Sequence, residues 1–260
     1  MTRKPQAIRE RESRPAVAKE FLRHDGRGPR QMRAFKVERG VLPHAEGSAM
    51  VSMGRTRVLC AATIEDRVPG WLRGKNQGWV TAEYGMLPRA TGERTPRTSQ
   101  TGGRAQEIQR LIGRSLRSVT DLKAFGERTV ILDCDVIEAD GGTRTAAING
   151  AFVALVDALS AAGAPFAADV LSDSIAAISV GLLDGVELLD LEYREDRDAE
   201  VDFNIVMTGS GQFVEVQGGG EEATFTRVQL DRLISLGEQG IRAVAAVQKA
   251  ALGERWHWHS

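Results

Sequence analysis

The alternation of apolar and polar residues predicts a β-meander near the start of the chain, where periodic sequence begins at about Ala34. Residues 35–38 and 49–53 alternate as half-buried strands do, and residues 56–64 form a longer apolar strand. Gly54-Arg55 between the last two segments fits a tight turn. We therefore expect three consecutive strands joined by short connections.

Three segments farther along are predicted to be helices. In residues 105–122 the apolar positions recur at helical spacing, and residues 145–162 form an Ala-rich helix with Gly150 inside it, which suits close packing between layers. Residues 226–252 predict a long amphipathic helix with its N-cap at Thr224 or Thr226. One strand is predicted over residues 79–84, before the first of these helices, and another over residues 129–137, between the first two.

The second half of the chain contains two hairpin patterns. Asp184-Gly185 separates strands predicted over 174–183 and 186–191, and a Gly-Ser-Gly turn separates 201–208 from 212–217. Strands and helices are interspersed and no change in composition divides the body. The pattern predicts an α+β fold with mixed sheets. We expect three parts: a disordered extension over 1–20, a single domain over 21–252 and a tail over 253–260.

Composition excludes several classes of protein. The chain has 260 residues, of which 42% are hydrophobic, so it can bury a full core without cross-links. Two cysteines, Cys60 and Cys134, exclude a disulfide scaffold and a zinc site with several thiolates. No apolar run is long enough to span a bilayer, and residues 1–20 lack the apolar core of a signal peptide. We expect a soluble cytoplasmic protein without membrane contact.

The net charge of −1 conceals two opposed blocks. Residues 67–117 contain ten basic and three acidic side chains, whereas residues 184–222 contain twelve acidic side chains and two arginines. One interpretation is a polyanion-binding protein that also handles a divalent cation. The other is that the blocks are solvated faces that pair with each other, and charge alone favours this second interpretation.

Asp140-Gly141-Gly142-Thr143-Arg144-Thr145 stands between a predicted buried strand and a helix. A helix N-terminus offers unpaired N–H groups and the positive end of the helix dipole. Glycines let the backbone approach an anion, Thr143 adds a hydroxyl donor, and Arg144 adds a planar guanidinium suited to phosphate. The alternative is an ordinary strand-to-helix turn with Thr143 as N-cap, and the residues leave the two interpretations even.

Gly102-Gly103-Arg104 opens the predicted helix over 105–122 in a similar way. An arginine at a helix start is repelled by the positive end of the dipole, so structure alone gains little from it. A bound anion would offset that repulsion. The alternative is a flexible loop end with a solvated arginine. Two glycine-arginine helix starts in one chain strengthen the interpretation of both as phosphate sites.

Acidic residues cluster between 190 and 204, where Asp196 and Asp202 bracket a predicted turn into a strand. Hard carboxylate oxygens of this kind suit Mg²⁺ or Mn²⁺ with retained waters. A solvated acidic loop is the better interpretation of this segment taken alone.

Two predicted loops carry several basic residues and few aromatic ones. Such residues favour contacts to a nucleic-acid backbone held more by charge than by stacking, and the alternative is a solubilising surface. The residues in question are Arg67, Arg73, Lys75, Arg89, Arg94 and Arg97. Trp79 and Tyr84 lie in a predicted strand and are expected in the core.

Several longer motifs together resemble the ribonuclease PH family of phosphorolytic exoribonucleases. The similarity extends from about Phe21 to about Lys249. The matching segments include RHDGR (23–27), EDRVP (65–69), GWVTAEY (78–84), MLPR (86–89), EIQRLIGR (107–114), DCDV (133–136), ADGGTRT (139–145), VMTG (206–209) and GEEATF (220–225). The stretch from Arg97 to Arg104 is a few residues shorter than the family pattern, and Gly219 stands where that pattern has Thr.

The resemblance implies a fold of two βαβ-type halves and a phosphate-dependent 3′-to-5′ exoribonuclease. It implies trimming of transfer RNA precursors, with ribosomal RNA as a further substrate, and assembly as a homohexamer, a trimer of dimers. By the family pattern, Arg104, Gly142, Thr143 and Arg144 hold inorganic phosphate, and Asp196 and Asp202 lie at the active site where Mg²⁺ assists. The basic residues of the two predicted loops match the segment that contacts RNA in this family.

Two rival functions remain open from the sequence. A hydrolytic two-metal nuclease needs more converging carboxylates than Asp196 and Asp202, and it releases monophosphates without added phosphate. A non-catalytic RNA-binding ring subunit tolerates loss of the arginine and aspartate groups. All four charged groups are present here, which favours activity.

Overall fold

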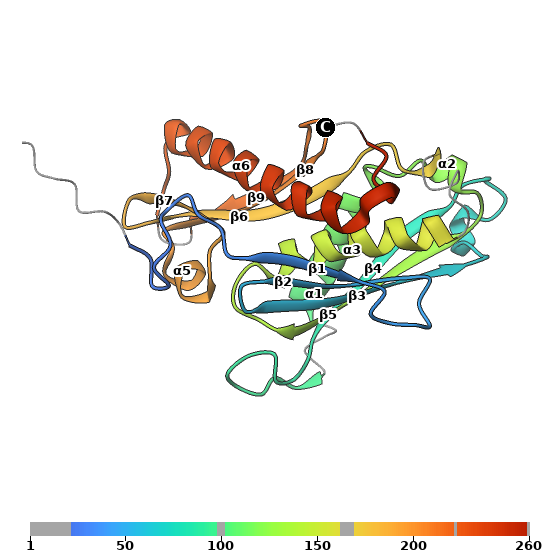
Figure 1. The fold of residues 1–260 in the computed structure, drawn as a ribbon, viewed down its shortest axis with the longest axis horizontal. Helices are drawn as coiled ribbons and strands as arrows, with labels where there is room; N and C mark the ends of the chain where they lie inside the picture. Colours follow the sequence, from blue (N-terminus) through green and yellow to red (C-terminus); the bar gives the residue numbers. More distant parts are fainter. Residues whose placement is uncertain (1–21, 98–101, 162–168, 221–222, 259–260) are drawn as a thin grey trace, which may run out of the picture.

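Two β-sheets with helices between and over them make up the fold (Figure 1). The computed structural model describes residues 22–97, 102–161, 169–220 and 223–258. The predicted α+β class is confirmed. The predicted disordered extension over 1–20 lies outside the described residues, and so does the end of the predicted tail at 259–260.

The first sheet has the strand order β1-β2-β3-β5-β4. The strands are β1 (Phe35–Arg39), β2 (Gly47–Met53), β3 (Thr56–Glu65), β4 (Trp79–Met86) and β5 (Thr129–Glu138). The predicted meander is confirmed, because β1, β2 and β3 pair antiparallel in sequence order. Strand β4 runs parallel to β5 and is joined to it through α1 (Gly103–Arg117), so this half contains a βαβ unit.

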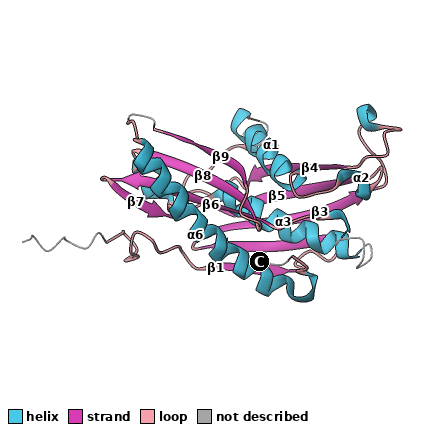
Figure 2. Cartoon of the chain, turned by 90° about the horizontal axis from the view of Figure 1, so that it is seen from above, coloured by secondary structure: helices cyan, strands magenta, loops and turns pink. Residues whose placement is uncertain are grey.

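The second sheet has the order β7-β6-β8-β9, and all its described pairs are antiparallel. Its strands are β6 (Ile175–Leu183), β7 (Val186–Leu189), β8 (Val201–Thr208) and β9 (Phe213–Gly219). Asp184 and Gly185 have φ of 51° and 73°, as a two-residue hairpin turn requires, so the first predicted hairpin is confirmed. The sheets lie side by side in the view from above (Figure 2).

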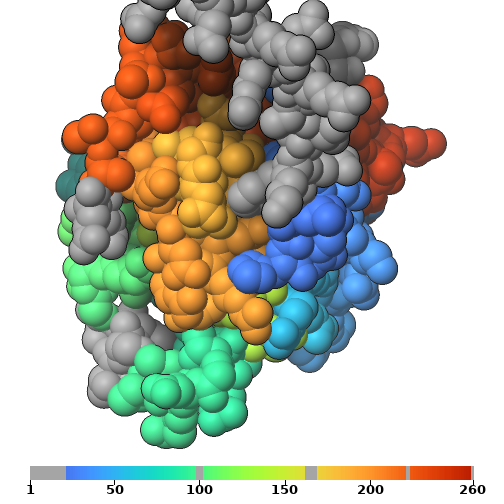
Figure 3. All heavy atoms as spheres, turned by 90° about the vertical axis from the view of Figure 1, so that its left-hand side faces the viewer, coloured from blue at the N-terminus to red at the C-terminus, as the bar shows by residue number. Residues whose placement is uncertain are grey.

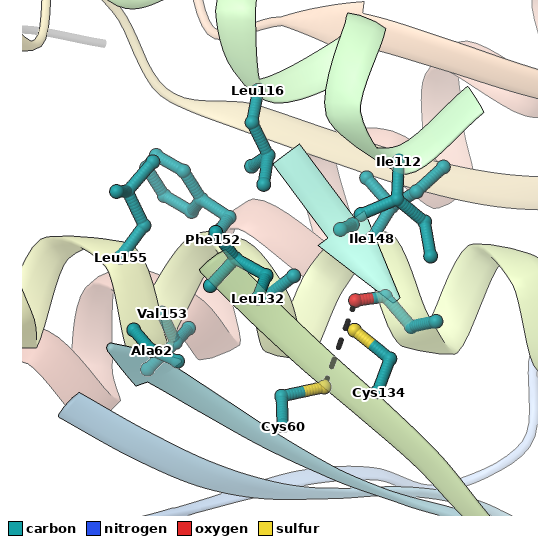
Figure 4. Packing of buried hydrophobic residues seen from close by; sticks show 14 of the residues in the cluster. Cys60, Ala62, Ile112, Leu116, Leu132, Cys134, Ile148, Phe152, Val153 and Leu155 are labelled. Atoms are coloured by element: carbon teal, nitrogen blue, oxygen red, sulfur yellow. Dashed lines mark hydrogen bonds between the residues drawn. The ribbon is translucent and has the colours of Figure 1, made fainter. Parts of the chain in front are cut away.

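Helix α3 (Thr143–Ala161) lies between the two sheets and is buried along all of residues 145–159. It packs against β2, β3 and β5 of the first sheet and β6 of the second. A helix that is apolar on every side belongs in such a position. Gly150 is needed there, because a Cβ at this position would lie 2.7 Å from the Cys60 sulfur. Figure 4 shows Cys60 and Cys134 in this core, and both are free thiols.

Helix α6 (Arg227–Leu252) covers the second sheet and reaches β1 of the first (Figure 2). Its N-cap is Thr226, in a reciprocal capping box with Gln229, which confirms one of the two predicted caps. No helix among the described residues has the length and apolar character needed to cross a bilayer.

The predicted helix over 105–122 is wrong at its C-terminal end. Helix α1 ends at Arg117, and a separate short helix α2 (Leu122–Phe125) follows. The Asp121 carboxylate accepts hydrogen bonds from the backbone N–H groups of Lys123 and Ala124, so it caps a new helix instead of continuing the old one. Further short helices among the described residues are η1 (Gly70–Leu72), α5 (Tyr193–Asp198) and η3 (Gly253–Arg255).

The segment predicted as a C-terminal tail is packed onto α3 as far as it is described. The Trp258 indole donates to the backbone carbonyl of Leu171 at 3.1 Å, and the rings of Trp256 and Trp258 lie 6.3 and 5.4 Å from that of Phe152. Arg39, Asp157 and Arg255, which we call the tail cluster, form ion pairs of 2.5 Å each at the same end of α3.

Candidate functional site

Residues 140–144 form a tight turn from β5 into α3, and its backbone lies against the segment that leads into α5. Gly141 and Gly142 have φ of 77° and 66°, a region that residues with side chains rarely adopt. A Cβ on Gly141 would lie 2.6 Å from the carbonyl oxygen of Leu191 and 2.9 Å from the backbone nitrogen of Tyr193. The glycine therefore permits the two segments to touch, and the N–H groups of α3 open beside them.

Thr143 is the first residue of α3, so the predicted alternative role as N-cap does not describe it. Its hydroxyl oxygen accepts a hydrogen bond of 2.9 Å from the Tyr84 hydroxyl. Burial raises the pKa of Tyr84, although the charges of Arg104 and Arg144 oppose that rise. Because Tyr84 supplies the proton of this bond, the Thr143 hydroxyl hydrogen stays available to another acceptor.

Arg144 is held by side chains from two other elements. Its Nη1 donates to Oε1 of Gln217 on β9 at 3.2 Å and lies 3.8 Å from Oε1 of Glu107 on α1. Gln217 in turn donates from Nε2 to the same Glu107 oxygen at 2.7 Å. The guanidinium therefore has a defined place at the point where α1, α3 and β9 meet.

Arg104 is the second residue of α1, one position after Gly103 and two after the N-cap Gly102. No side chain caps this helix start, its first turn has no acidic residue, and Arg104 is exposed. Its charge acts on both Tyr84 and Asp196. The two glycine-arginine helix starts predicted from the sequence thus converge on one place.

Asp196 and Asp202 belong to different elements of the second half. Asp196 lies in α5, and Asp202 lies near the start of β8. The surrounding protein removes water from the Asp196 carboxyl and Asp202 adds a like charge, so the pKa of Asp196 is raised, against the opposing charges of Arg144, Arg104 and Arg33. Asp196 is exposed, as the interpretation of a solvated acidic segment expects, but it stands on a capped helix instead of a loop, and the charges of Arg144, Arg104 and Arg33 act on it.

Two neighbouring carboxylates fit a Mg²⁺ or Mn²⁺ ion that keeps several waters and takes further oxygens from a substrate. Within the described residues, no group of three or more His, Cys, Asp or Glu side chains is arranged to hold a metal. The donor set thus suits a hard ion shared with a substrate and does not suit a closed structural metal site.

The six predicted RNA-binding residues are all exposed, but they form two groups. Arg67, Arg73 and Lys75 lie in the loop before β4, and Arg89, Arg94 and Arg97 lie after it. An eight-residue strand spans roughly 25 Å, so the two loops are at opposite ends of β4 (Figure 1). Residues 87–97 protrude below α5 in Figure 3. They lie next to the phosphate turn, since the N–H of Ala139 donates to the carbonyl of Ala90 at 2.8 Å. The first loop lies at the other end of the molecule.

The basic and acidic blocks pair with each other in part, as the interpretation of two solvated, mutually pairing faces expects. Arg114 of α1 pairs with Glu215 of β9 at 2.8 Å. Arg67 instead pairs with its neighbour Glu65 at 2.9 Å.

Some residues around the turn were missed from the sequence. Tyr84 was expected only in the core, and no role in the site was predicted for Thr56 or Arg33. Thr56 accepts a bond of 2.9 Å from the N–H of Asp140 and donates one of 2.6 Å to the carbonyl of Gly141. No local pattern marks such residues, because their partners lie between 59 and 107 positions away.

Comparison with known proteins gives two matches to one family. The 3′ exoribonuclease family, domain 1, matches residues 31–160, and its domain 2 matches residues 173–240. Ribonuclease PH of Moorella thermoacetica is 55% identical over 241 residues, covering 90% of this chain and 96% of its own. Ribonuclease PH of Bacillus pumilus is also 55% identical over 241 residues, covering 90% of this chain and 99% of its own.

Solved structures share the fold at lower identity. Rice Rrp46 superposes with a TM-score of 0.72 and 23% identity over 88% of this chain and all of its own. A chain of the Archaeoglobus fulgidus exosome, solved with RNA bound to its active site, superposes with a TM-score of 0.74 and 20% identity. That match covers 86% of this chain and 92% of the archaeal one. Both similarities concern the fold.

Proposed function

Since this chain belongs to the ribonuclease PH family of 3′ exoribonucleases, we propose that the turn at 140–144, Arg104 and the Asp196–Asp202 pair form its phosphorolytic active site. The activity itself follows from the family. The protein is a phosphate-dependent 3′-to-5′ exoribonuclease, a nucleotidyltransferase that trims transfer RNA 3′ ends with inorganic phosphate as co-substrate.

The physical difficulty of this reaction is that one anion must attack another. Phosphate and the last phosphodiester repel each other, and fixed cations aimed at them offset that repulsion. Arg104, Arg144 and the N–H groups at the start of α3 hold the attacking phosphate. The Thr143 hydroxyl, which receives its own hydrogen bond from Tyr84, donates to the same ion. The observation that carries this assignment is the hydrogen bond of 2.9 Å from Tyr84 to Thr143 at the start of α3, together with the charges of Arg104 and Arg144 that act on Tyr84.

In the reaction, a phosphate oxygen forms a bond to the phosphorus of the last phosphodiester, and the bond from that phosphorus to the preceding 3′ oxygen breaks. The departing 3′ oxygen takes up a proton, which leaves an RNA shorter by one nucleotide. The released product is a nucleoside 5′-diphosphate. One phosphodiester is exchanged for one phosphoanhydride, so excess nucleoside diphosphate drives the reverse reaction and extends the RNA.

Asp196 and Asp202 would hold a divalent cation, Mg²⁺ or Mn²⁺. When bound, that ion supplies positive charge for the developing negative charge on the leaving oxygen. The raised pKa of Asp196 supports this role, since a site that disfavours two neighbouring carboxylates gains from a cation between them.

The two basic loops contact the RNA backbone, with Arg89, Arg94 and Arg97 nearest the phosphate turn and Arg67, Arg73 and Lys75 at the far end of β4. This separation supports assembly as a homohexamer, a trimer of dimers, in which a distant loop of one copy serves RNA bound to another. Light scattering coupled to size-exclusion chromatography measures the oligomer. Ribosomal RNA as a second substrate and a cytoplasmic location stay predictions.

Product analysis tests the site and separates the rival functions. A transfer RNA with extra 3′ nucleotides is incubated with Mg²⁺, with and without phosphate, and the products are separated by thin-layer chromatography. We expect nucleoside diphosphates only when phosphate is present. Monophosphates released without phosphate would indicate a hydrolytic nuclease, and RNA that binds but is not shortened would indicate a non-catalytic subunit.

Substitution of the arginines tests the residue assignment. Arg104→Ala and Arg144→Ala each remove a cation that faces developing negative charge, and we expect each to lower phosphate-dependent turnover by roughly 100-fold or more. Arg242→Ala, which removes an exposed arginine of α6, is the matched control and leaves turnover unchanged. Full activity of Arg104→Ala would contradict the assignment.

A further inference from the structure

Beneath the proposed site lies a buried group of three arginines and two carboxylates, which we call the site cluster. Arg23, Arg27 and Arg33 come from the segment that precedes β1, and Asp190 and Glu195 come from the connection between β7 and α5 and from α5 itself. All five residues are less than a tenth exposed. In Figure 3 the segment from residue 22 onward lies directly against the connection that contains α5.

Arg33 occupies the centre of this cluster. Its Nε donates to Oδ2 of Asp190 at 2.9 Å and its Nη2 donates to Oδ1 at 2.6 Å, while its backbone N–H donates to Oδ2 at 2.7 Å. Burial by itself would lower the pKa of Arg33, but the hydrogen bond and charge of Asp190 outweigh it and raise the pKa. The guanidinium is therefore permanently charged and fixed against one carboxylate.

The remaining donors of Arg33 extend to the phosphate turn. Nη1 donates to the carbonyl oxygen of Asp140, and Nη2 lies 3.5 Å from that of Gly141 and 3.2 Å from that of Leu191. One side chain thus bonds both to the turn that enters α3 and to the segment that enters α5. These are the two segments whose backbones touch at Gly141.

Arg23 holds α5 from the side that faces the protein interior. Its Nε donates to Oε1 of Glu195 at 2.6 Å, and its Nη2 donates to the other oxygen of the same carboxylate. Glu195 also accepts the N–H of Glu192 at 2.9 Å, which closes the capping box of the helix. Asp196 is the next residue along, so the buried pair determines where its carboxylate can lie.

From these contacts we propose that Arg33 is a positioning residue for phosphorolysis, setting the separation between the phosphate turn at 140–144 and the Asp196 carboxylate. The proposal rests on the function proposed above and concerns residues that do not touch phosphate or RNA. Its physical basis is that a reaction between held groups loses rate steeply when their spacing changes.

Two features distinguish this role from simple stabilisation. A buried ion pair contributes little net stability compared with apolar residues of equal size, so stability does not account for five buried charges in one place. In addition, Arg33 uses donors on all three guanidinium nitrogens toward two segments of the chain, the turn at Asp140 and the Asp190–Leu191 segment. A lysine has its three donors on a single nitrogen and cannot reproduce the planar, spread arrangement by which Arg33 bonds to both segments.

The test compares Arg33→Lys with Arg39→Lys, a matched control in the tail cluster. Arg39 also binds a buried aspartate through two nitrogens and a carbonyl through the third, but its partners are Asp157 and Ala251. At matched folded fraction, we expect Arg33→Lys to lower kcat/KM for phosphate by roughly 100-fold, while the KM for RNA is unchanged. Arg39→Lys should stay within about twofold of the parent protein, since it alters no contact of the site.

A second pair of variants keeps the proposal testable if Arg33→Lys does not fold. Thr56→Val removes the two hydrogen bonds that hold the turn from β3, and Thr56→Ser retains them. We expect the valine variant to raise the KM for phosphate by about tenfold, as loss of a hydrogen bond to the turn implies, and the serine variant to restore it. In both variants the arginines that hold phosphate are still present.

Equal loss of kcat/KM in Arg33→Lys and Arg39→Lys would overturn the proposal, because it would show that the site cluster only stabilises the fold. An unchanged phosphate KM in Thr56→Val would overturn it as well. Failure of the proposed function is distinguishable, since the parent protein itself would then release no diphosphate when phosphate is added.

Discussion

The site cluster and the tail cluster use the same chemistry at opposite ends of α3. In both, arginines from the chain around β1 bind aspartates that lie more than 100 positions later in the sequence. They differ in what else the arginine holds. Arg33 bonds to the carbonyl groups of a turn beside Asp196, whereas Arg39 bonds to the carbonyl of Ala251 near the end of α6.

They also differ in burial. The side chains of Arg33 and Asp190 are 5% and 0% exposed, while those of Arg39 and Arg255 are 25% and 45% exposed around Asp157. Water can therefore partly replace Asp157 as the partner of its arginines, but it cannot replace Asp190. The comparison indicates that an ion network can either secure a chain terminus or set the geometry of a site, depending on which backbone groups it also binds.

Ranked by the expected change in the free energy of unfolding, Asp190→Asn has the largest effect. It leaves Arg33 buried without its carboxylate and removes one of the three carboxylates that Arg27 contacts. Breaking a buried pair in this way costs about 3–5 kcal/mol. Denaturant unfolding measures the loss. Activity per folded molecule should fall as well, and a variant that loses stability but keeps full specific activity would contradict the role given to the site cluster.

Asp157→Asn is the corresponding change in the tail cluster. Its two arginine partners are partly exposed, so we expect a smaller loss of about 1–3 kcal/mol. Phosphate-dependent turnover, measured at a temperature where the variant is fully folded, should equal that of the parent protein. A turnover defect larger than about twofold would erase the distinction between the two clusters.

Tyr84→Phe removes one hydrogen bond at the phosphate turn and no charge. The expected loss of stability is about 1 kcal/mol, and an equal loss of phosphate binding corresponds to about a fivefold rise in the phosphate KM. Phosphate titration of the exoribonuclease rate measures this rise. Thr143→Ser serves as the control, since it retains the hydroxyl that Tyr84 orients, and it should behave as the parent protein does.

Asp196→Asn should have the smallest effect on stability, with the opposite sign. Because the folded protein raises the pKa of Asp196, the folded state binds the proton more tightly, and stability falls as pH rises through the range just above the ordinary value of 3.8. The variant should be more stable than the parent at pH 7 by less than about 1 kcal/mol, since the residue is exposed. Below pH 3 the two unfolding curves should converge.

Activity measurements contrast Asp196→Asn with Asp157→Asn. Asp196→Asn should abolish most phosphate-dependent turnover while gaining stability, whereas Asp157→Asn loses stability and keeps turnover. A carboxylate that costs stability where it lies is typical of a functional site. Measurable turnover close to that of the parent protein in Asp196→Asn would remove Asp196 from the site.

Elements whose signals lie within a few residues were predicted from the sequence. The meander of β1, β2 and β3, the Asp184-Gly185 hairpin and the capped α6 each depend on local spacing or on a residue that favours one turn. The two glycine-arginine helix starts were found for the same reason, because a helix N-terminus and its neighbours are contiguous in the chain.

Tertiary structure decided the rest, since it depends on contacts between distant segments. Helix α5 was missed because five of its six residues are charged, and a buried pair between Glu195 and Arg23, 172 positions apart, holds it in place. The end of α1 was missed because Asp121 caps a new helix there. The convergence of Arg104, Arg144 and Asp196 needs α3 between both sheets, and only the packed fold brings these charges within reach of one another.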